Sequence, residues 1–333
     1  MVIHQNRRTW VCWVSVAILT ATPVPAGAVV VSTTTGNTSA PSEDPGWANV
    51  GNIGVYLGNR WVLTAEHVGA GAIRFGSQTY APLPGSSVRL HNPAGSGLTL
   101  LTDLLLYRLT SDPGLPAVTI SPTAPPVGAG VILIGNGRDR QAGETRWNVN
   151  ESTTPWTWTE APPGEQGNYR GFLTNTSSVK RWGTNVIEDP ANRYPTSRYG
   201  DHSLVENLGT YGDLVSLYTQ FDSSGTPFEA QAVTGDSAGG VFYKNGSQWE
   251  LAGLIHAVDL FSGQPPLDLN GQSLPHSAVY GNTTFLSDLS VYRPEILGIV
   301  PEPGTWAMLA GLAAMGLLAL WRRHGKETAR HPI

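Results

Sequence analysis

The sequence contains very little cysteine, since Cys12 is the only one among 333 residues. A single cysteine excludes an intramolecular disulfide framework, so the fold must be held together by its core. Internal repeats of roughly 20–50 residues and long runs of helical periodicity are also missing, which argues against a helical architecture. The 39 glycines and 25 prolines are instead typical of short strands joined by turns.

The sequence also lacks the patterns of several kinds of ligand site. His91, His202 and His276 are scattered among loops without paired ligands at a useful spacing, so no metal site is predicted. No glycine-rich phosphate loop precedes a helical segment. We therefore expect neither a metal nor a cofactor.

Positive charge is scarce in the body of the chain. The formal net charge is −5, and it falls to −9 when residues 1–28 and 300–333 are set aside, because these ends hold six basic and two acidic residues. This balance argues against nucleic acid as a partner.

The first 28 residues have the three parts of a secretory signal peptide. The basic start "MVIHQNRR" precedes the apolar stretch "TWVCWVSVAILT", and Ala26-Gly27-Ala28 supplies the small residues of a cleavage site. We expect signal peptidase to cut after Ala28, and Arg7-Arg8 leaves twin-arginine export open as the route. Because Cys12 lies in this segment, the mature chain would have no cysteine.

The other end carries an apolar segment followed by basic residues. Residues 304–321 are uncharged and would span about 27 Å as a transmembrane helix, close to the thickness of a bilayer core. Pro301-Glu302-Pro303 before this segment and Arg322-Arg323 after it resemble the PEP-CTERM sorting signal. The resemblance implies an exosortase as processing partner. It also implies a precursor tethered to the inner membrane and delivery to the cell surface or extracellular matrix of a Gram-negative-type bacterium.

Short apolar or alternating runs dominate the middle of the chain, for example "RWVLTA", "GVILIG" and "GVFYKNGSQWELAGLIHAVDL". Gly, Pro, Asn and Asp clusters separate these runs, and Asn245-Gly246 is a strong hairpin signal. We predict an all-β fold, either a sandwich or a barrel. Residues 138–224 form a looser region that either caps a cleft or decorates the fold.

Three polar residues lie at the edges of apolar strands. His67 follows "RWVLTAE", Asp103 stands at the head of "DLLLYRL", and Ser237 lies in the glycine-lined turn "TGDSAGG". Each residue alone has an ordinary explanation as a surface or turn residue. A carboxylate at the head of a buried strand is costly, however, unless another group binds it.

These three segments resemble the chymotrypsin/trypsin-like serine peptidase family. "WVLTAEHV" is similar to the family's W-V-L-T-A-A-H-C, "DLLLYRL" to D-I-A-L-L-K-L, and "GDSAGG" to G-D-S-G-G-P. The resemblance runs from about residue 52 to 290 and is weak between 138 and 224. It implies two antiparallel six-stranded β-barrels with a cleft between them, and endopeptidase activity on protein or peptide substrates.

The resemblance also implies a role for each residue. Ser237 would be the nucleophile, His67 the general base, and Asp103 the group that fixes the histidine tautomer. The backbone N–H groups of Gly235 and Ser237 would form the oxyanion hole. Ala238 departs from the family's glycine at its position, which puts the shape of this turn in question.

Asp236 is the predicted partner of a new N-terminus. In the family, the aspartate before the serine binds the ammonium group that activation cleavage creates. Cleavage after Ala28 would expose Val29-Val30, which stand 38 residues before His67 and could insert in this way. The alternative is a disordered leader, with Asp236 bound by local amides.

Two residues are candidates for the substrate pocket. Gln231 stands where trypsin-like members carry an aspartate, so selectivity for Lys or Arg lacks its charged anchor. His256 lies near the place where glutamate-specific relatives have a histidine, which predicts a glutamyl preference. A register shift of one residue would point this histidine elsewhere.

One alternative to the endopeptidase stays open. It is a catalytically silent relative that acts as a surface-binding or structural protein. An α/β-hydrolase esterase is disfavoured, because its Ser-Asp-His order and its helices are absent.

The predicted parts of the chain are a signal peptide (1–28), an N-terminal barrel with a polar leader (29–130), a C-terminal barrel with a long insertion (131–290), a linker (291–299), the sorting segment (300–324) and a tail (325–333).

Overall fold

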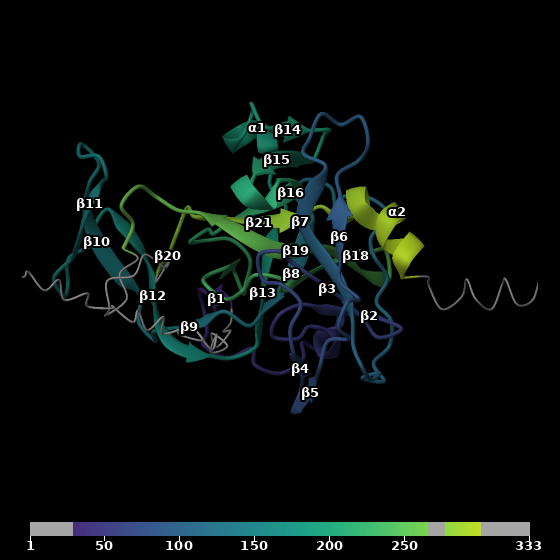
Figure 1. Ribbon diagram of the computed structural model, residues 1–333. Helices are drawn as coiled ribbons and strands as arrows, with labels where there is room; N and C mark the ends of the chain where they lie inside the picture. Colours follow the sequence, from purple (N-terminus) through teal and green to yellow (C-terminus); the bar gives the residue numbers. More distant parts are fainter. Residues whose placement is uncertain (1–28, 266–276, 301–333) are drawn as a thin grey trace, which may run out of the picture.

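The computed structural model describes residues 29–265 and 277–300, and their regular secondary structure is mostly β-strand with few helices. The all-β prediction is therefore confirmed (Figure 1). Within the described ranges, no helix has the length and apolar character needed to cross a bilayer. The expected signal peptide and the expected membrane span at 304–321 lie outside those ranges.

The N-terminal module contains six strands. Four of them form an antiparallel sheet in the order β2-β3-β7-β6, and β4 and β5 form a separate hairpin. Both faces of β7 are buried, which explains the uninterrupted apolar run of residues 104–107 in place of an alternating pattern. The strands are β2 (Val55–Gly58), β3 (Trp61–Thr64), β4 (Ile73–Phe75), β5 (Gln78–Tyr80), β6 (Val88–His91) and β7 (Leu101–Arg108).

Six consecutive strands of an eight-stranded sheet form the C-terminal module, in the order β13-β8-β18-β19-β21-β16. Its two end strands are linked, because the amide of Glu188 donates to the Tyr218 carbonyl at 3.0 Å. The predicted hairpin at Asn245-Gly246 joins β18 to β19, and Gly246 adopts a φ of 61° there. The strands are β8 (Gly130–Gly135), β13 (Arg181–Val186), β16 (Asp213–Gln220), β18 (Gly240–Asn245), β19 (Gln248–Asp259) and β21 (Thr283–Ser287). The structure thus contains the two six-stranded modules that the resemblance implies.

A shared hydrophobic cluster and helix α2 (Leu289–Ile299) join the two modules. The hydroxyl of Tyr292 in α2 donates to Asn92 Oδ1 of the N-terminal module at 2.8 Å. The same hydroxyl accepts a hydrogen bond from the amide of Val215 in the C-terminal module, also at 2.8 Å. The stretch 291–299 is therefore not a linker, because it is helical and buries Tyr292 and Ile296 against both modules.

The looser region at 138–224 contains β13 and β16 of the C-terminal module and two further parts. The first part joins with β20 (Ser277–Val279) in a separate five-stranded sheet, seen at the left of Figure 1, to which it contributes β9 (Arg138–Arg140), β10 (Thr145–Asn150), β11 (Thr157–Glu160) and β12 (Tyr169–Ser178). The second part extends the C-terminal sheet beyond β16 through α1 (Pro190–Arg193), β14 (Arg198–Tyr199), β15 (Ser203–Asn207) and the 3-10 turn η2 (Gly209–Tyr211).

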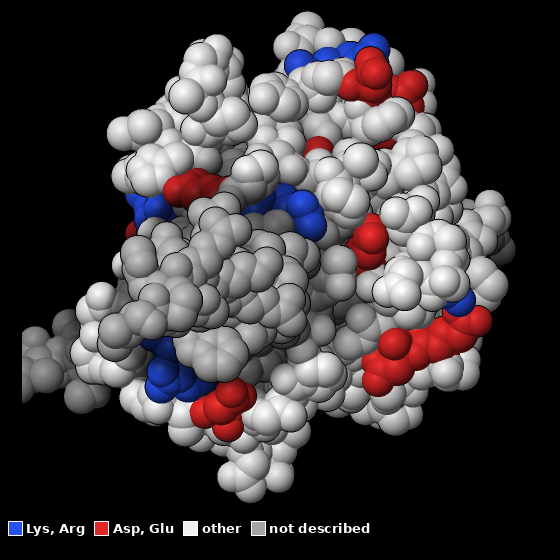
Figure 2. Space-filling model, turned by 90° about the vertical axis from the view of Figure 1, so that its right-hand side faces the viewer, with Lys and Arg blue, Asp and Glu red and all other residues white. Residues whose placement is uncertain are grey.

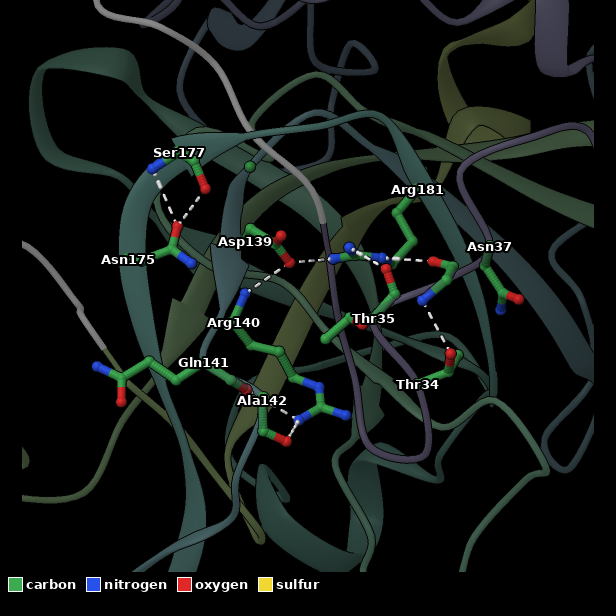
Figure 3. A network of polar contacts seen from close by, with 12 residues as sticks. Thr34, Thr35, Asn37, Asp139, Arg140, Gln141, Ala142, Asn175, Ser177 and Arg181 are labelled. Atoms are coloured by element: carbon green, nitrogen blue, oxygen red, sulfur yellow. Dashed lines mark hydrogen bonds and ion pairs between the residues drawn. The ribbon is translucent and has the colours of Figure 1, made fainter.

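The leader begins on the C-terminal module, although the sequence placed it with the N-terminal one. Strand β1 (Val30–Val31) pairs with β17 (Ala230–Gln231), and the 3-10 turn η1 (Trp47–Asn49) follows. Buried Arg181 fixes the segment between them: its Nε and Nη2 donate to the carbonyls of Gly36 and Thr35 at 2.7 and 2.6 Å. Its Nη1 lies 2.8 Å from Asp139 Oδ1 (Figure 3).

Charged residues make up 14% of the chain, and they do not gather in one large patch on the face shown in Figure 2. Small red and blue groups are separated there by uncharged atoms. On the face shown, no single large charged patch dominates the local electrostatics.

Candidate active site

His67 and Asp103 meet where two paired strands of the N-terminal module end. Thr64 at the end of β3 pairs with Leu105, so the turn after β3 passes beside Asp103. The carboxylate accepts the backbone N–H of His67 at 2.9 Å and lies 2.6 Å from its Nδ1. Because the carboxylate is the acceptor, Nδ1 carries the proton and Nε2 presents its lone pair. Asp103 is 1% exposed and the His67 side chain 25%, so the ring has one buried and one open side.

Ser237 lies in a turn that two unusual backbone conformations shape. Gly235 has a φ of 94° and Ala238 a φ of 65°, the left-handed region that favours glycine. The amide of Ala238 donates to the Ile255 carbonyl at 2.7 Å, which ties the turn to β19. Ala238 thus adopts a left-handed backbone conformation, at a strain cost of about 1–2 kcal/mol.

The turn presents two backbone donors. Among the described residues, the structure records no acceptor for the amide N–H of Gly235 or of Ser237, whereas the amides of Asp236, Ala238 and Gly239 all donate within the fold. Two neighbouring unpaired N–H groups beside a serine can bind an oxygen that gains negative charge.

The buried carboxylate of Asp236 supports the turn from behind. It accepts the amides of Gly137 at 2.6 Å and Val233 at 2.8 Å, and it is fully buried. A methyl group on Gly137 would lie 2.2 Å from Asp236 Oδ2, so only glycine allows this approach. Burial raises the pKa of Asp236 well above its usual range, an effect that the Val233 amide and the charge of Arg181 oppose.

Two of the three predicted residues, His67 and Asp103, are in contact, and Ser237 lies in the turn before β18 of the C-terminal module. Ala65, two residues before His67, and Ala238, next to Ser237, belong to the same hydrophobic cluster. The His67–Asp103 contact is formed, whereas in the described part of the chain no hydrogen bond is recorded between His67 Nε2 and the Ser237 hydroxyl. Such contacts are often long in structures without substrate and tighten only when substrate binds.

A cavity of about 210 Å³ adjoins Ser237. Its walls come from the serine turn and from the end of β19, and apart from His256 they carry no titratable side chain: Ala232, Val233, Thr234, Gly235, Ser237, Ile255, His256, Ala257 and Val258. Gln231 is not among these residues. It is buried beside them, and its Nε2 donates to the Thr283 carbonyl at 3.1 Å.

His256 lines the cavity, but other residues of the fold occupy its Nε2. This atom lies 2.5 Å from Glu206 Oε2 and 3.3 Å from Ser216 Oγ. The β19–β21 register shifts between Ile255 and Ala257, so a bulge sets the direction of this side chain. A carboxylate of the protein therefore already binds the nitrogen that the predicted glutamyl preference would need.

Two further residues lie at this site that no sequence motif indicated, Glu206 and Tyr211. Both come from the β15–β16 hairpin, and the ring of Tyr211 packs edge-on to His67 with centroids 5.8 Å apart. Arg89 donates to the Tyr211 carbonyl at 2.6 Å, which fixes the turn to the N-terminal module. This part of the 138–224 region therefore reaches the site. A short Gly-bounded turn such as "GTYG" has no pattern that predicts such a contact.

Segment 29–31 lies next to Asp236. Val29, Val30 and Val31 are fully buried in the C-terminal module. A methyl group built on Gly135 would lie 2.1 Å from Asp236 Oδ1 and 3.1 Å from Val29 Cγ1, so the carboxylate and Val29 flank the same glycine. Residues 29–31 are thus part of the fold rather than a disordered leader, and local amides bind Asp236. The structure therefore has one feature of each alternative drawn from the sequence: a buried leader, and local amides on Asp236.

The comparison with protein families matches residues 33–179 to the family Trypsin. The chain carries a trypsin-family region. This match includes His67 and Asp103 but ends before Ser237. Residues 300–323 match the PEP-CTERM protein-sorting motif, which confirms the second resemblance.

Solved structures of serine proteases and their relatives are similar to this chain. Neuropsin, a serine protease of mouse brain, is 18% identical over 74% of this chain and 87% of its own, with a TM-score of 0.42. A mutant of human heparin binding protein is 14% identical over 75% and 85%, with a TM-score of 0.40. The NS6 protease of murine norovirus 1 is 14% identical over 75% and 93%, with a TM-score of 0.35. No curated protein matches the chain.

Proposed function

We propose that the chain is an exported serine endopeptidase in which Ser237 is the nucleophile, His67 the general base and Asp103 the residue that orients the base. The observation that carries this proposal is the state of His67. Its Nδ1 and its backbone N–H are both bound to buried Asp103, and its side chain is 25% exposed, so in the neutral ring Nε2 would keep a lone pair to accept a proton. This is the arrangement that a serine hydroxyl needs in order to lose its proton.

The reaction divides into two steps. Nε2 takes the hydroxyl proton as Ser237 Oγ attacks the scissile carbonyl, and the resulting oxyanion accepts hydrogen bonds from the amides of Gly235 and Ser237. His67 then donates that proton to the leaving amine, which leaves an acyl group on Ser237. A water molecule releases the acyl group by the same sequence, and Asp103 stabilises the imidazolium each time.

The cavity beside Ser237 favours an uncharged substrate side chain. Its lining is apolar or weakly polar, so neither an acidic nor a basic side chain finds an opposite charge there. A substrate carboxylate would have to displace Glu206 from His256. We therefore propose substrates with small or medium uncharged residues before the cleaved bond, in place of the glutamyl preference suggested by the sequence.

The start of the mature chain supports a simple route of maturation. Cleavage after Ala28 would place an ammonium group on Val29, close to the carboxylate of Asp236, which bears burial without a full counter-charge. An ion pair there would fix the serine turn and lower the raised pKa of Asp236. Removal of the signal peptide and activation would then be one event.

Asp236→Asn tests this route, because it keeps the volume and one acceptor but removes the charge. We expect mature Asp236→Asn to lose activity at least tenfold while its start remains Val29. A start well downstream of Val29 in the active wild-type enzyme would contradict the maturation route without affecting the triad.

The sorting motif supports a location. A signal peptidase would release the N-terminus, the apolar segment before Arg322-Arg323 would hold the precursor in the inner membrane, and an exosortase-type enzyme would process the tail. The mature enzyme would then act on proteins or peptides at the cell surface or in the extracellular matrix.

A fluorophosphonate label on the exported chain tests the proposal. Ser237 should react, and Ser237→Ala should abolish both the label and peptide hydrolysis, with a loss of roughly a thousandfold or more. Ser216→Ala is the matched control, since it removes the other serine that lies beside a histidine. Labelling of that variant should match the wild type.

A catalytically silent binding protein is the second candidate function. The observation that favours it is the missing hydrogen bond between His67 and Ser237 within the described residues. Wild-type protein that is folded, starts at Val29 and still fails to label would establish this alternative and refute the endopeptidase.

A further inference from the structure

A second cavity, of about 490 Å³, lies where the leader, the β4–β5 hairpin and the end of β8 meet. It is larger than the cavity beside Ser237, and it contains two basic residues and no carboxylate, in a protein whose net charge is negative. Its walls are Thr38, Trp47, Ala48, Val50, Arg74, Phe75, Gly76, Tyr80, Pro113, Leu115, Asn136 and Lys180.

Lys180 is the principal charge of this cavity. Its Nζ donates to the carbonyl oxygens of Trp47 and Val50, the latter at 2.6 Å, and lies 4.3 Å from the centroid of the Trp47 ring. Among the described residues no carboxylate lies within ion-pair distance of it, and Asp44 acts on it only from further away. Burial lowers the pKa of Lys180 to about 8. An ammonium group held this way lacks a counter-ion, which is costly inside a protein.

Lys244 provides the comparison, because it is the only other lysine among the described residues. It also lies near a tryptophan ring, 5.6 Å from the centroid of Trp249. There, however, the carboxylate of Glu43 completes the arrangement by binding the ammonium group. The same pairing in the cavity has no carboxylate, so an external anion could take the place that Glu43 takes at Lys244.

The other walls of the cavity suit a carboxylate attached to an apolar or aromatic body. The guanidinium of Arg74 is exposed, and no partner for it is recorded in the described part of the chain. The rings of Phe75 and Tyr80 lie 5.9 Å apart and offer an aromatic wall. A cation can thus bind the charged end while the rings cover the rest.

We propose that this cavity binds a carboxylate-bearing ligand, with Lys180 and Arg74 as its charge partners and the aromatic residues as its walls. The cavity adjoins the candidate active site through the chain itself. Asn136 lines it, and the next residue, Gly137, donates to Asp236 beside Ser237. The carboxylate can come from an acidic side chain of a protein substrate or from a free small acid. Only the first source rests on the proposed function.

Phenylacetate is the probe, and lysine NMR is the measurement. In the exported chain labelled with carbon-13 at the lysine side chains, the signals of Lys180 and Lys244 are assigned by substituting each with methionine. Phenylacetate added to about 10 mM, enough to fill a millimolar site, should shift the Lys180 signal saturably and leave the Lys244 signal in place. Phenylacetamide has the same shape without the charge and should shift neither.

Two substitutions test the charge partners. Lys180→Met should abolish binding, as measured by calorimetry, but it also removes two hydrogen bonds to the leader. Arg74→Gln changes an exposed side chain and should weaken binding about threefold to tenfold with no change in unfolding temperature. Lys244→Met should bind as the wild type does. The absence of a saturable Lys180 shift, or equal shifts at both lysines, overturns the proposal.

Paired peptides distinguish the two sources of the carboxylate. A set carrying either Glu or Gln at each position around the cleaved bond is compared by kcat/KM. If the cavity binds a substrate side chain, one Glu peptide is cleaved about tenfold better than its Gln partner, and phenylacetate removes the difference. If it binds a free acid, phenylacetate binds although no Glu peptide is preferred. Loss of all hydrolysis would refute the proposed function and leave the NMR result intact.

Discussion

Two histidine–carboxylate pairs lie within the same region of the molecule, and they differ in which ring nitrogen the carboxylate holds. Asp103 lies 2.6 Å from Nδ1 of His67, and Glu206 lies 2.5 Å from Nε2 of His256. The His67 side chain is 25% exposed, whereas that of His256 is 1% exposed. A carboxylate on Nδ1 leaves Nε2 available at the cleft, but a carboxylate on Nε2 uses the atom that would otherwise act as a base.

The location of each histidine explains this difference. His67 stands in a turn beyond β3, where the ring can face the junction between the modules. His256 lies within β19 at a bulge, and its Nδ1 is buried without a recorded partner among the described residues. A histidine–carboxylate contact alone therefore does not identify a base; the free nitrogen must also reach the cleft.

The largest expected effect comes from breaking the two pairs separately. Asp103→Asn should lower kcat by roughly a thousandfold to ten-thousandfold, the size known for the serine protease triad, because the amide no longer fixes the tautomer of His67. Glu206→Gln should lower kcat less than tenfold. Steady-state kinetics on an uncharged peptide substrate measures both variants. Equal losses would mean that His256 takes part in catalysis and that the comparison drawn here is wrong.

Glu206→Gln also tests whether Glu206 determines the specificity for the substrate residue before the cleaved bond. Removal of the internal carboxylate makes the His256 ring available to a carboxylate from outside. We expect the ratio of kcat/KM for glutamate against leucine before the cleaved bond to rise about tenfold or more. An unchanged ratio would mean that the ring faces away from the bound side chain.

The turn that carries Ser237 depends on Gly137, which lies against the carboxylate of Asp236. Gly137→Ala places a methyl group 2.2 Å from Asp236 Oδ2, so the turn that carries Ser237 must shift. We expect a loss of activity of at least tenfold and a loss of stability of about 1–3 kcal/mol. Gly143→Ala is the matched control, because no atom lies within 4 Å of the added methyl. Urea unfolding and the labelling rate separate the two effects.

The contacts between Arg181 and the leader are expected to contribute to the stability of the fold and to have little effect on catalysis. Arg181→Lys keeps the charge but cannot reach Asp139 and the carbonyls of Thr35 and Gly36 together (Figure 3). We expect a loss of about 2–3 kcal/mol in urea unfolding and faster proteolysis within residues 32–37. Arg198→Lys, at an exposed residue with one long hydrogen bond of 3.4 Å, should change neither measurement.

The sequence was sufficient for the parts of the site that short motifs encode. His67, Asp103 and Ser237 stand at strand ends within apolar runs, and the strand pairing of β3 with β7 brings two of them into contact. The all-β class could be predicted for a similar reason, because alternation and turn residues act over a few positions, whereas the two six-stranded modules were implied only by the family resemblance.

The features that the sequence could not predict depend on contacts between residues that are far apart in the chain. β1 pairs with β17 across 200 residues, and no local pattern of three valines indicates that partner. The direction of the His256 ring depends on one bulged residue in β19, which a strand pattern does not reveal. Helix α2 buries only three of its eleven residues, so the sequence of 291–299, predicted as a linker, has no wide apolar face that would indicate a helix.

A third histidine–carboxylate pair provides the smallest expected effect. His91 Nδ1 lies 2.7 Å from Glu295 Oε1 between β6 and α2, with side chains 48% and 30% exposed. Water screens such a pair, so Glu295→Gln should cost about 0.5 kcal/mol or less in urea unfolding and leave kcat unchanged. The amide oxygen of the glutamine can still accept the backbone N–H of His91, which Glu295 accepts at 2.9 Å. A loss well above 1 kcal/mol would show that this pair joins the modules as α2 itself does. The contrast among the three pairs would then lie in position alone rather than in burial.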